Sequence, residues 1–378
     1  MSEPSVFLPR PRLAGSQSPS HALERAAAYA MRAPSLHNSR PWEISLSPTA
    51  MAIRADRTRQ LMAVDPRGRE LVLSVGAALF NARVALAERG WASEITRLPD
   101  PDDPDLLAEV RPVRGAPDSA LAALAPAVIR RRTNRRRFTG PDVPDAALRR
   151  LTAIAELEGV LLIPVVDDGH RRLIARLTRQ ADALQNADGA YRAELRRWTR
   201  RAPDGRNGIP ADVMPSVDGR HRDDVPLCDV DTGGAGELPQ DTDSDVDQTM
   251  VLLATRTDDQ LAWLRAGEAL QHVLLELTRL GWVAGPLPQA VEVPLTRTQL
   301  RAAFTWSAHP QILVRIDHAA TTARTPLRQR SDVVRDIQLP LDPVALQDRP
   351  TSTGRRAEWT PSPAHRPVSD GRGGTTGF

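Results

Sequence analysis

Residues 76–91 read GAALFNARVALAERGW, and residues 267–282 read GEALQHVLLELTRLGW. Six of the sixteen aligned positions are identical, and the two glycines of each stretch are 14 residues apart. The likeness favours an internal duplication of the fold, although two amphipathic helices that end at a glycine could also look alike by chance. Apolar residues at helical spacing predict one core helix in each region: Leu71, Val75, Ala78, Leu79, Ala82 and Leu86, then Leu270, Val273, Leu274, Leu277 and Leu280.

Shorter apolar runs have the length and composition of strands. They lie at 42–46, 51–54, 161–166, 249–255 and 311–316. Ser47-Pro48 separates the first two runs, which predicts a hairpin. The alanine-rich residues 21–31 predict a further helix, and another is expected after Val143 with Asp145 as its N-cap.

Three stretches lack apolar periodicity. Residues 1–20 are rich in proline and serine, and both they and residues 347–378 are predicted to be disordered tails. Residues 200–247 form a long irregular stretch inside the chain. Such a stretch is usually a lid, a binding loop or a disordered insert.

Composition excludes several classes of protein. All 50 basic residues are arginine, and a P-loop protein, a protein kinase or a pyridoxal-phosphate enzyme needs a lysine in its site. The net charge of +3 does not by itself indicate a nucleic-acid partner. Cys228 is the single cysteine, so no internal disulfide is expected. With no signal-like run and no segment near the roughly 20 apolar residues that span a bilayer, we expect a cytoplasmic protein.

The first segment that could carry chemistry is APSLHNSRPW at residues 33–42, between a predicted helix and a predicted strand. Pro34 disfavours helix in the residue before it, and Pro41 stiffens the chain before Trp42. Ser35 and Asn38 offer short polar side chains from the loop. A capped helix end followed by a turn would use the same residues.

The second segment is RRRTNRRRF at residues 130–138, in which six of nine residues are arginine. A guanidinium group binds phosphate in a bidentate manner. A solvated charge run or a nucleic-acid patch are the alternatives. Thr133 and Phe138 add a hydroxyl and an apolar anchor, which favours a cluster built into the fold.

The third segment is GWVAGPLPQ at residues 281–289, where a helix ends and a loop with proline and glycine follows. Such a loop is often a plain connection, but it can also place a backbone N–H against a flat ligand. Together the three segments supply what FMN needs: arginines and hydroxyls for the phosphate, small polar groups for the ribityl chain, and apolar cover for the ring.

These segments resemble the nitroreductase superfamily, and within it the Acg-like branch of actinobacteria. Residues 33–42 match the motif A-P-S-x-x-N-x-Q-P-W except at Arg40, where glutamine is usual. Residues 131–135 match R-R-S/T-x-R, with Phe138 one residue further along than in ordinary nitroreductases. Residues 281–287 match the late G-L-x-x-x-P-hydrophobic segment, with Trp282 in place of leucine. The resemblance covers roughly residues 21–330.

The resemblance implies an α+β fold, with a mixed sheet flanked by helices and two degenerate tandem halves that form a pseudo-dimer in one chain. The halves would span 21–125 and 126–340, with a lid or insert at about 200–247. Here the A-P-S motif lies in the first half and the arginine motif in the second, so a single complete flavin site should remain.

By resemblance, FMN would bind to residues from all three segments and to one late phosphate arginine. Arg324, Arg328 and Arg330 are the candidates for that arginine, and Arg328 is the one we select. The predicted cofactor-binding residues are Pro34, Ser35, Asn38, Arg131, Arg132, Thr133, Arg135, Pro286, Leu287, Pro288, Gln289 and Arg328. No catalytic side chain is assigned, because the flavin carries the chemistry.

The leading expectation is an FMN-dependent oxidoreductase that uses NAD(P)H to reduce a nitro compound or a quinone, as a monomer or homodimer. One alternative is a protein that binds or stores FMN under a lid without turnover. A second is nucleic-acid binding through residues 130–137. Histidine and cysteine spacing indicates no metal site, and the acidic run at 241–247 lacks the glycine and glutamate of a calcium loop.

Overall fold

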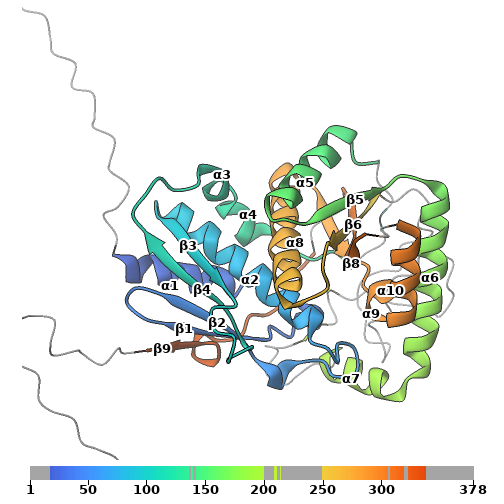
Figure 1. Cartoon of the computed structure of the whole chain (residues 1–378), viewed down its shortest axis with the longest axis horizontal. Helices are drawn as coiled ribbons and strands as arrows, with labels where there is room; N and C mark the ends of the chain where they lie inside the picture. The colour runs from blue at the N-terminus through green and yellow to red at the C-terminus, as the bar shows by residue number, and fades with distance from the viewer. Residues whose placement is uncertain are drawn as a thin grey trace, which may run out of the picture. The chain divides into compact units, whose positions relative to one another are not determined.

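The computed structural model describes residues 18–135, 138, 142–199, 208–210, 213, 249–304, 307–318 and 322–337 (Figure 1). Residues 1–17 and 338–378, and most of 200–247, lie outside this description, so the structure does not test the tails or most of the insert. Helix α1 (Pro19–Ala30) begins two residues before the helix predicted at 21–31, with the Ser18 side chain at its N-cap.

The described strands form two sheets. The first has the order β3-β4-β2-β1-β9 and the second β5-β6-β8-β7. All strand pairs are antiparallel except β1 with β9, which makes the first sheet mixed. The strands are β1 (Trp42–Leu46), β2 (Met51–Ala55), β3 (Ala92–Arg97), β4 (Leu106–Val113), β5 (Leu161–Val165), β6 (Thr249–Thr255), β7 (Val283–Pro286), β8 (His309–Asp317) and β9 (Val334–Asp336).

The two sheets share one topology. In each half a helix comes first, α1 or α5 (Asp145–Leu157), followed by two strands, a long helix and two more strands. The long helices are α2 (Arg69–Glu88) and α8 (Gln260–Leu280). When β5 to β8 are matched in chain order to β1 to β4, the sheet order β7-β8-β6-β5 repeats β3-β4-β2-β1. This confirms the internal duplication predicted from residues 76–91 and 267–282, and β9 returns the chain to the first sheet.

Helices α2 and α8 lie side by side between the two sheets (Figure 1). They cross where Gly76 meets Gly267. A Cβ atom on Gly76 would lie 2.0 Å from the carbonyl oxygen of Leu264, and one on Gly267 would lie 1.9 Å from that of Leu73. Each contacted leucine stands three residues before the partner glycine, so the two contacts are related by a pseudo-two-fold axis. Only glycine allows backbones to approach this closely.

Side-chain pairs beside the crossing follow the same symmetry. The Phe80 and His272 rings stack with centroids 4.6 Å apart, and Gln271 Nε2 donates to Asn81 Oδ1 at 2.7 Å. Positions 80 and 271 are equivalent in the repeat, as are 81 and 272. One pair therefore maps onto the other, as in the interface of a symmetric dimer.

Helix α2 is the centre of the core. Among the described residues it is the one helix with the length and apolar composition to cross a membrane, and 94% of that window is buried in the protein. The expectation that no segment has this length therefore needs correction. The physical reason is packing: α1, α8 and strands of the first sheet all cover this helix, so apolar residues are needed on several of its sides.

Local signals set most element boundaries. Gly281 ends α8 with φ +89°, as predicted, and Gly90 reverses the chain after α2 with φ +79°. Asp145 is not the N-cap of α5: Pro144 takes that position, and Asp145 is the first helical residue. Its carboxylate lies in the first turn, where the positive end of the helix dipole favours it.

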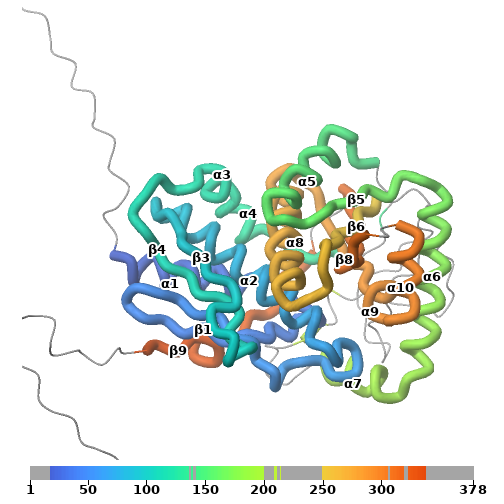
Figure 2. The backbone as a smooth tube through the Cα atoms, viewed as in Figure 1, coloured from blue at the N-terminus to red at the C-terminus, as the bar shows by residue number. Residues whose placement is uncertain are grey.

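The halves differ mainly by an insert. Residues 47–50 join β1 to β2, whereas β5 and β6 are separated by α6 (Asp168–Ala187), α7 (Gly189–Thr199) and residues largely outside the described part. Tyr191 and Leu195 of α7 pack on Leu61 and Val64 of the first half, and Figure 2 shows α7 beside that segment. The remaining elements are η1 (Leu36–Asn38), η2 (Arg57–Arg59), α3 (Ser119–Ala122), α4 (Ala125–Arg130), α9 (Gln289–Glu292), α10 (Pro294–Phe304) and η4 (Arg330–Asp332).

The helix crossing gives a first prediction. Gly76→Ala places a Cβ against backbone that cannot rotate away, so we expect the free energy of unfolding to fall by about 3 kcal/mol, the upper end of ordinary overpacking. Gly189→Ala is the matched control, because nothing lies within 4 Å of its Cβ position. Denaturant unfolding measures both, and equal stability of the two variants would rule out a tight crossing.

Candidate functional site

A cleft opens between the two long helices and the second sheet. Its apolar walls are Leu73 of α2, Leu270 and Leu274 of α8, Ala284 of β7, and Ile312 and Val314 of β8. We call it the apolar cleft. The space between these walls is about 1070 Å³ when the open solvent at the mouth is included. Walls of this kind, mostly apolar with a few polar groups, suit a flat organic ligand.

A second cavity adjoins the first and shares four of its lining residues: Pro34, Ser35, Thr133 and Arg135. We call it the arginine pocket. Among the described residues that line it, six are arginines and none is an aspartate or glutamate; the arginines are Arg32, Arg40, Arg131, Arg132, Arg135 and Arg324. The two cavities form one site with an apolar end and a cationic end.

Loop 31–41 forms the wall between the two ends. His37, Asn38 and Arg40 have φ of 46°, 58° and 48°, in the left-handed region that costs non-glycine residues of order 1–3 kcal/mol each. Side chains hold this shape: Ser35 Oγ accepts from the Arg40 backbone N–H at 2.9 Å, and Asn38 Nδ2 donates to the Gly208 carbonyl at 2.8 Å. Such retained strain is typical of a binding loop.

Arg40 is the most unusual residue of the arginine pocket. It is 3% exposed, and its Nε and Nη1 atoms have no hydrogen-bond partner within the described residues. Burial, followed by the nearby charges of Arg131 and Arg328, lowers its pKa to about 9. A buried cation with unpartnered donors strongly favours an anionic ligand.

The arginine motif is pinned to β7. Thr133 forms a bridge with Ala284, and the Asn134 N–H donates to the Ala284 carbonyl at 3.0 Å. Gly285 permits this approach, because a Cβ there would lie 2.3 Å from the Asn134 carbonyl oxygen. Arg131 Nη1 then donates to Thr133 Oγ1 at 3.2 Å, and burial with the neighbouring arginines lowers the pKa of Arg131 to about 10.

The late segment is divided between the cleft and the core. Pro286 and Pro288 line the apolar cleft. Leu287 lies in the core behind it and donates its backbone N–H to the Leu313 carbonyl at 2.9 Å. Gln289 is fully buried at the start of α9 and does not line either cavity. Residues that face the cleft and residues that face the core therefore alternate between Pro286 and Gln289.

The three late arginines lie in different surroundings. Arg324 lines the arginine pocket. Arg328, the residue selected from the sequence, instead supports loop 31–41 from behind: its Nη1 donates to the Arg40 carbonyl at 3.0 Å and its Nη2 to that of Asp332 at 2.6 Å. Arg330 forms ion pairs with Glu24 and Asp336.

Several site residues carried no signal in the sequence. Arg32 precedes the A-P-S motif, and Glu70 and Ser74 lie on the first turns of a helix that is otherwise apolar. Gln311 and Arg315 come from β8. Their residue types are ordinary, and only the packing of α2 and β8 brings them to the cleft.

The pseudo-two-fold axis relates the apolar cleft to a second position, the mate site, which has different lining residues. A cavity there is lined by Arg83, Trp91, Ser93 and Ile95, the repeat equivalents of Leu274, Trp282, Ala284 and Pro286. Arg83 bridges two carboxylates, to Glu158 at 2.6 Å and to Glu268 at 2.7 Å.

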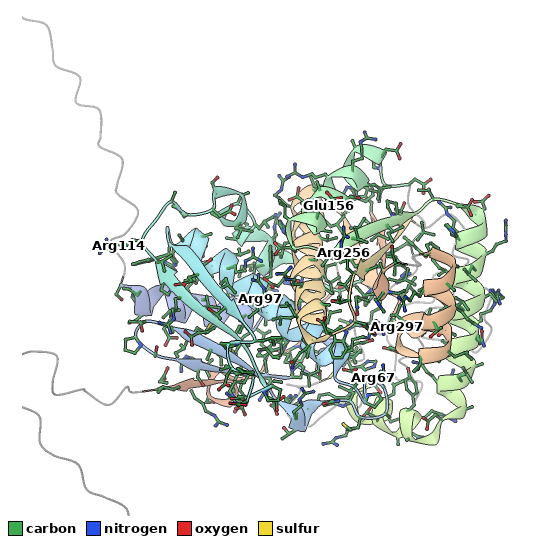
Figure 3. All side chains as sticks on the ribbon, viewed as in Figure 1. Arg67, Arg97, Arg114, Glu156, Arg256 and Arg297 are labelled. Carbon is green, nitrogen blue, oxygen red and sulfur yellow. The ribbon has the colours of Figure 1, made fainter. Side chains whose placement is uncertain are left out.

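Arg97 completes this network from β3, at 2.6 Å from Glu268, and Figure 3 shows it between β3 and α8. Although burial opposes it, hydrogen bonds from His272 and Arg83 lower the pKa of Glu158 to about 2. The cations of the mate site are thus matched by carboxylates, in contrast to those of the arginine pocket.

A buried acidic cluster borders the apolar cleft. Asp65, Glu70 and Glu292 surround Arg69, whose Nη2 donates to Glu70 Oε1 at 2.6 Å. Burial raises the pKa of Glu292 to about 7, and burial together with Glu292 raises that of Glu70.

Comparison with known proteins gives close relatives over most of the chain. It is 36% identical over 317 residues to "Putative NAD(P)H nitroreductase Rv3131" of Mycobacterium tuberculosis, covering 81% of this chain and 88% of that protein. It is 31% identical over 310 residues to "Putative NAD(P)H nitroreductase acg" of the same organism, covering 80% and 91%. No protein-family model matches the chain.

A third relative, "Uncharacterized protein Rv3127" of Mycobacterium tuberculosis, is 32% identical over 338 residues, covering 84% of this chain and 94% of that protein. Among solved structures, an FMN-bound nitroreductase from Desulfitobacterium hafniense aligns at 15% identity with a TM-score of 0.36, over 57% of this chain and 98% of that one.

The arginine pocket predicts stabilisation by anions. Inorganic phosphate should raise the Tm of the wild type at constant ionic strength, because it binds the folded state and offsets repulsion among six guanidinium groups. Arg40→Gln should lose at least half of that shift, whereas the exposed Arg114→Gln should keep it. Thermal unfolding with and without phosphate measures this, and an unchanged shift in Arg40→Gln would exclude Arg40 from the anion site.

The acidic cluster predicts a pH dependence of stability. The pKa of Glu292 is raised in the folded state, so its contribution to stability is present below the ordinary glutamate pKa and is lost as pH rises through about 7. We expect the free energy of unfolding to decline across that range, and Glu292→Gln to decline less steeply. Urea unfolding between pH 5 and 8 tests this; parallel curves for the two proteins would contradict it.

Proposed function

The chain belongs to the nitroreductase family, and on that premise we propose that it is an FMN-dependent oxidoreductase that uses NAD(P)H to reduce a nitro compound or a quinone. The single observation that carries the proposal is the continuity of the apolar cleft with the arginine pocket. FMN has the same two ends, a flat apolar ring and a phosphate dianion, joined by a polar ribityl chain.

The residues present fit this cofactor. Arg40 and Arg131 would hold the phosphate, since each has a buried guanidinium nitrogen without a partner in the described part of the chain. Ser35 and Thr133 line both cavities and would meet the ribityl chain at their junction. Leu73 of α2 and residues of α8 and β8 would cover the ring.

When bound, FMN would supply two-electron chemistry between a nicotinamide and the acceptor. The protein would bind it, orient it and exclude water from one face. The apolar walls give that face a low dielectric, which strengthens every electrostatic interaction inside the cleft.

The proposal extends to the organisation and setting of the chain. We place the halves at about 21–125 and 126–340, with residues 200–247 as an insert over the site and residues 1–20 and 347–378 as tails. The chain would act on small molecules in the cytoplasm, as a monomer or a homodimer. Its arginine motif faces a pocket, which supports a phosphate ligand over a nucleic-acid surface.

One observation favours a second function, in which FMN is bound without turnover. Ile209, from the insert, lines the apolar cleft, and the neighbouring Gly208 carbonyl accepts from Asn38. Glu194 of α7 accepts from the backbone N–H groups of Ala63 and Val64 at 3.0 and 3.1 Å. A docked insert of this kind would narrow the access that a stacked nicotinamide needs.

The visible spectrum of the purified protein separates these functions. We expect a yellow protein with one FMN per chain that NADPH bleaches without oxygen. A yellow protein bleached by dithionite but not by NADPH or NADH would support FMN storage. A colourless protein that takes up no added FMN would contradict both proposed functions.

A pair of adjacent variants tests the binding residues. Arg131→Gln should weaken FMN binding by roughly 10- to 100-fold, since charge-assisted hydrogen bonds contribute about 1.5–3 kcal/mol each. Arg130→Gln is the control, because Arg130 is exposed and lines neither cavity. Titration of the apoprotein with FMN gives both affinities, and equal losses in the two variants would contradict the assigned site.

A further inference from the structure

One acidic side chain stands on the wall of the apolar cleft. Glu70 is the second residue of α2, it is 9% exposed, and it lines the cleft beside Ser74. Neither the sequence motifs nor the cofactor-binding residues account for it. A carboxyl group in an apolar wall is costly unless it is neutral or paired.

Glu70 belongs to a cluster that holds more carboxylates than cations. Asp65, Glu70 and Glu292 share Arg69, and two of the Arg69 hydrogen bonds go to the carbonyls of Gln311 and Val291. Asp65 Oδ2 accepts from a backbone N–H.

The neighbouring cation, Arg297, favours a negative charge on Glu70 but is itself paired with another carboxylate. Arg297 is paired with Asp258 at 2.7 Å. Glu292 Oε2 accepts from Gln185 Nε2 at 2.6 Å, while its Oε1 has no partner among the described residues. Three buried carboxyl groups around one shared guanidinium favour retention of at least one proton at neutral pH.

Other polar residues of the cleft are poor proton donors. Burial and then Arg135 lower the pKa of His37 to about 4, so this histidine is neutral at pH 7. Arg135 and Arg315 also line the cleft, but guanidinium groups do not release protons in this pH range. The Ser74 hydroxyl already donates to the Glu70 carbonyl at 2.7 Å. Among the described residues that line the cleft, Glu70 is the one with a carboxyl group.

We propose that Glu70 is the proton donor to the electron acceptor in this cleft, an inference that rests on the proposed oxidoreductase function. Reduction of a quinone consumes one hydride, which the nicotinamide supplies by way of the cofactor, and one proton. The Glu70 O–H bond breaks, a new O–H bond forms on the acceptor oxygen, and the carboxylate regains its proton from solvent. A nitro compound consumes the same hydride and proton to give a nitroso compound and water.

The cluster explains how the proton is kept ready. Burial, followed by Glu292 and Asp65, disfavours a negative charge on Glu70, whereas Arg69 and Arg297 favour it. The raised pKa of Glu70 favours the neutral acid, the form that a general acid needs before it donates its proton. As pH rises and Glu70 ionises, proton transfer should fail while electron transfer remains possible.

The test compares two oxidants on the prereduced, FMN-loaded enzyme. A benzoquinone takes up hydride and proton, whereas ferricyanide takes only electrons. In Glu70→Gln we expect the ratio of the quinone rate to the ferricyanide rate to fall about 100-fold, the ordinary effect of losing a general acid. Glu70→Asp should restore part of the ratio. A wild-type ratio and pH profile in Glu70→Gln would overturn the proposal.

A matched variant tests the role of the cluster. Glu292 does not line the cleft. At low pH, Glu292→Gln should show the wild-type ratio of the quinone rate to the ferricyanide rate. As pH rises, this ratio should fall at a lower pH than in the wild type, because loss of the Glu292 negative charge lowers the pKa of Glu70. An unshifted profile would overturn the role of the cluster.

An infrared readout does not depend on turnover. The wild type at pH 7 should show a protonated carboxyl band that Glu70→Gln removes, with folding checked by circular dichroism. If the protein binds no FMN, the proposed function fails, and this band still decides the protonation of Glu70. A band that Glu70→Gln leaves unchanged, or no band at all in the wild type, would overturn the proton-donor proposal while leaving FMN binding intact.

Discussion

The close crossing of α2 and α8 is the constraint on which the rest of the structure depends. Gly76 and Gly267 let two long helices approach until backbone meets backbone. The crossing brings the first turns of α2, with Glu70 and Ser74, beside Leu270 and Leu274 of α8. Because α8 also packs on the second sheet, the same approach forms three walls of the apolar cleft. The site thus comes from the junction of the halves and belongs to neither alone.

The two halves differ more in their charged residues and loops than in their strand order. Both sheets retain one strand order, yet the loop before the first strand runs from 31 to 41 in one half and only from 158 to 160 in the other. Among the described residues of the site beside the longer loop, arginines gather without carboxylates. In its mate, Arg83 and Arg97 meet Glu158 and Glu268. The first arrangement calls for an anionic ligand, and the second supplies its own anions.

Buried charges are therefore balanced in three different ways in this fold. In the mate site the cations are paired with carboxylates. Breaking these ion pairs is costly, but they need no ligand. The arginine pocket holds cations in excess, so its stability is tied to an anion. The cluster around Arg69 holds carboxyl groups in excess, so its charge is tied to pH. In each case the balance of neighbours, more than the residue type, determines what the group can do.

The sequence by itself determined the local structure and the family. Helical spacing located α2 and α8, apolar runs located β1 and β6 with their observed bounds, and the repeated glycines revealed the duplication, because these signals act over a few residues. The motifs likewise indicated Ser35, Thr133 and Arg131 as residues near one ligand.

Only the tertiary structure decided which neighbours of those motifs face the site. It placed Arg324 in the pocket and Arg328 behind it, turned Leu287 into the core, and brought Glu70 from an apolar helix to the cleft wall. The physical reason is that the direction of a side chain in a loop or at a helix end is set by packing against segments far away in the chain. That information is absent from any short window of sequence.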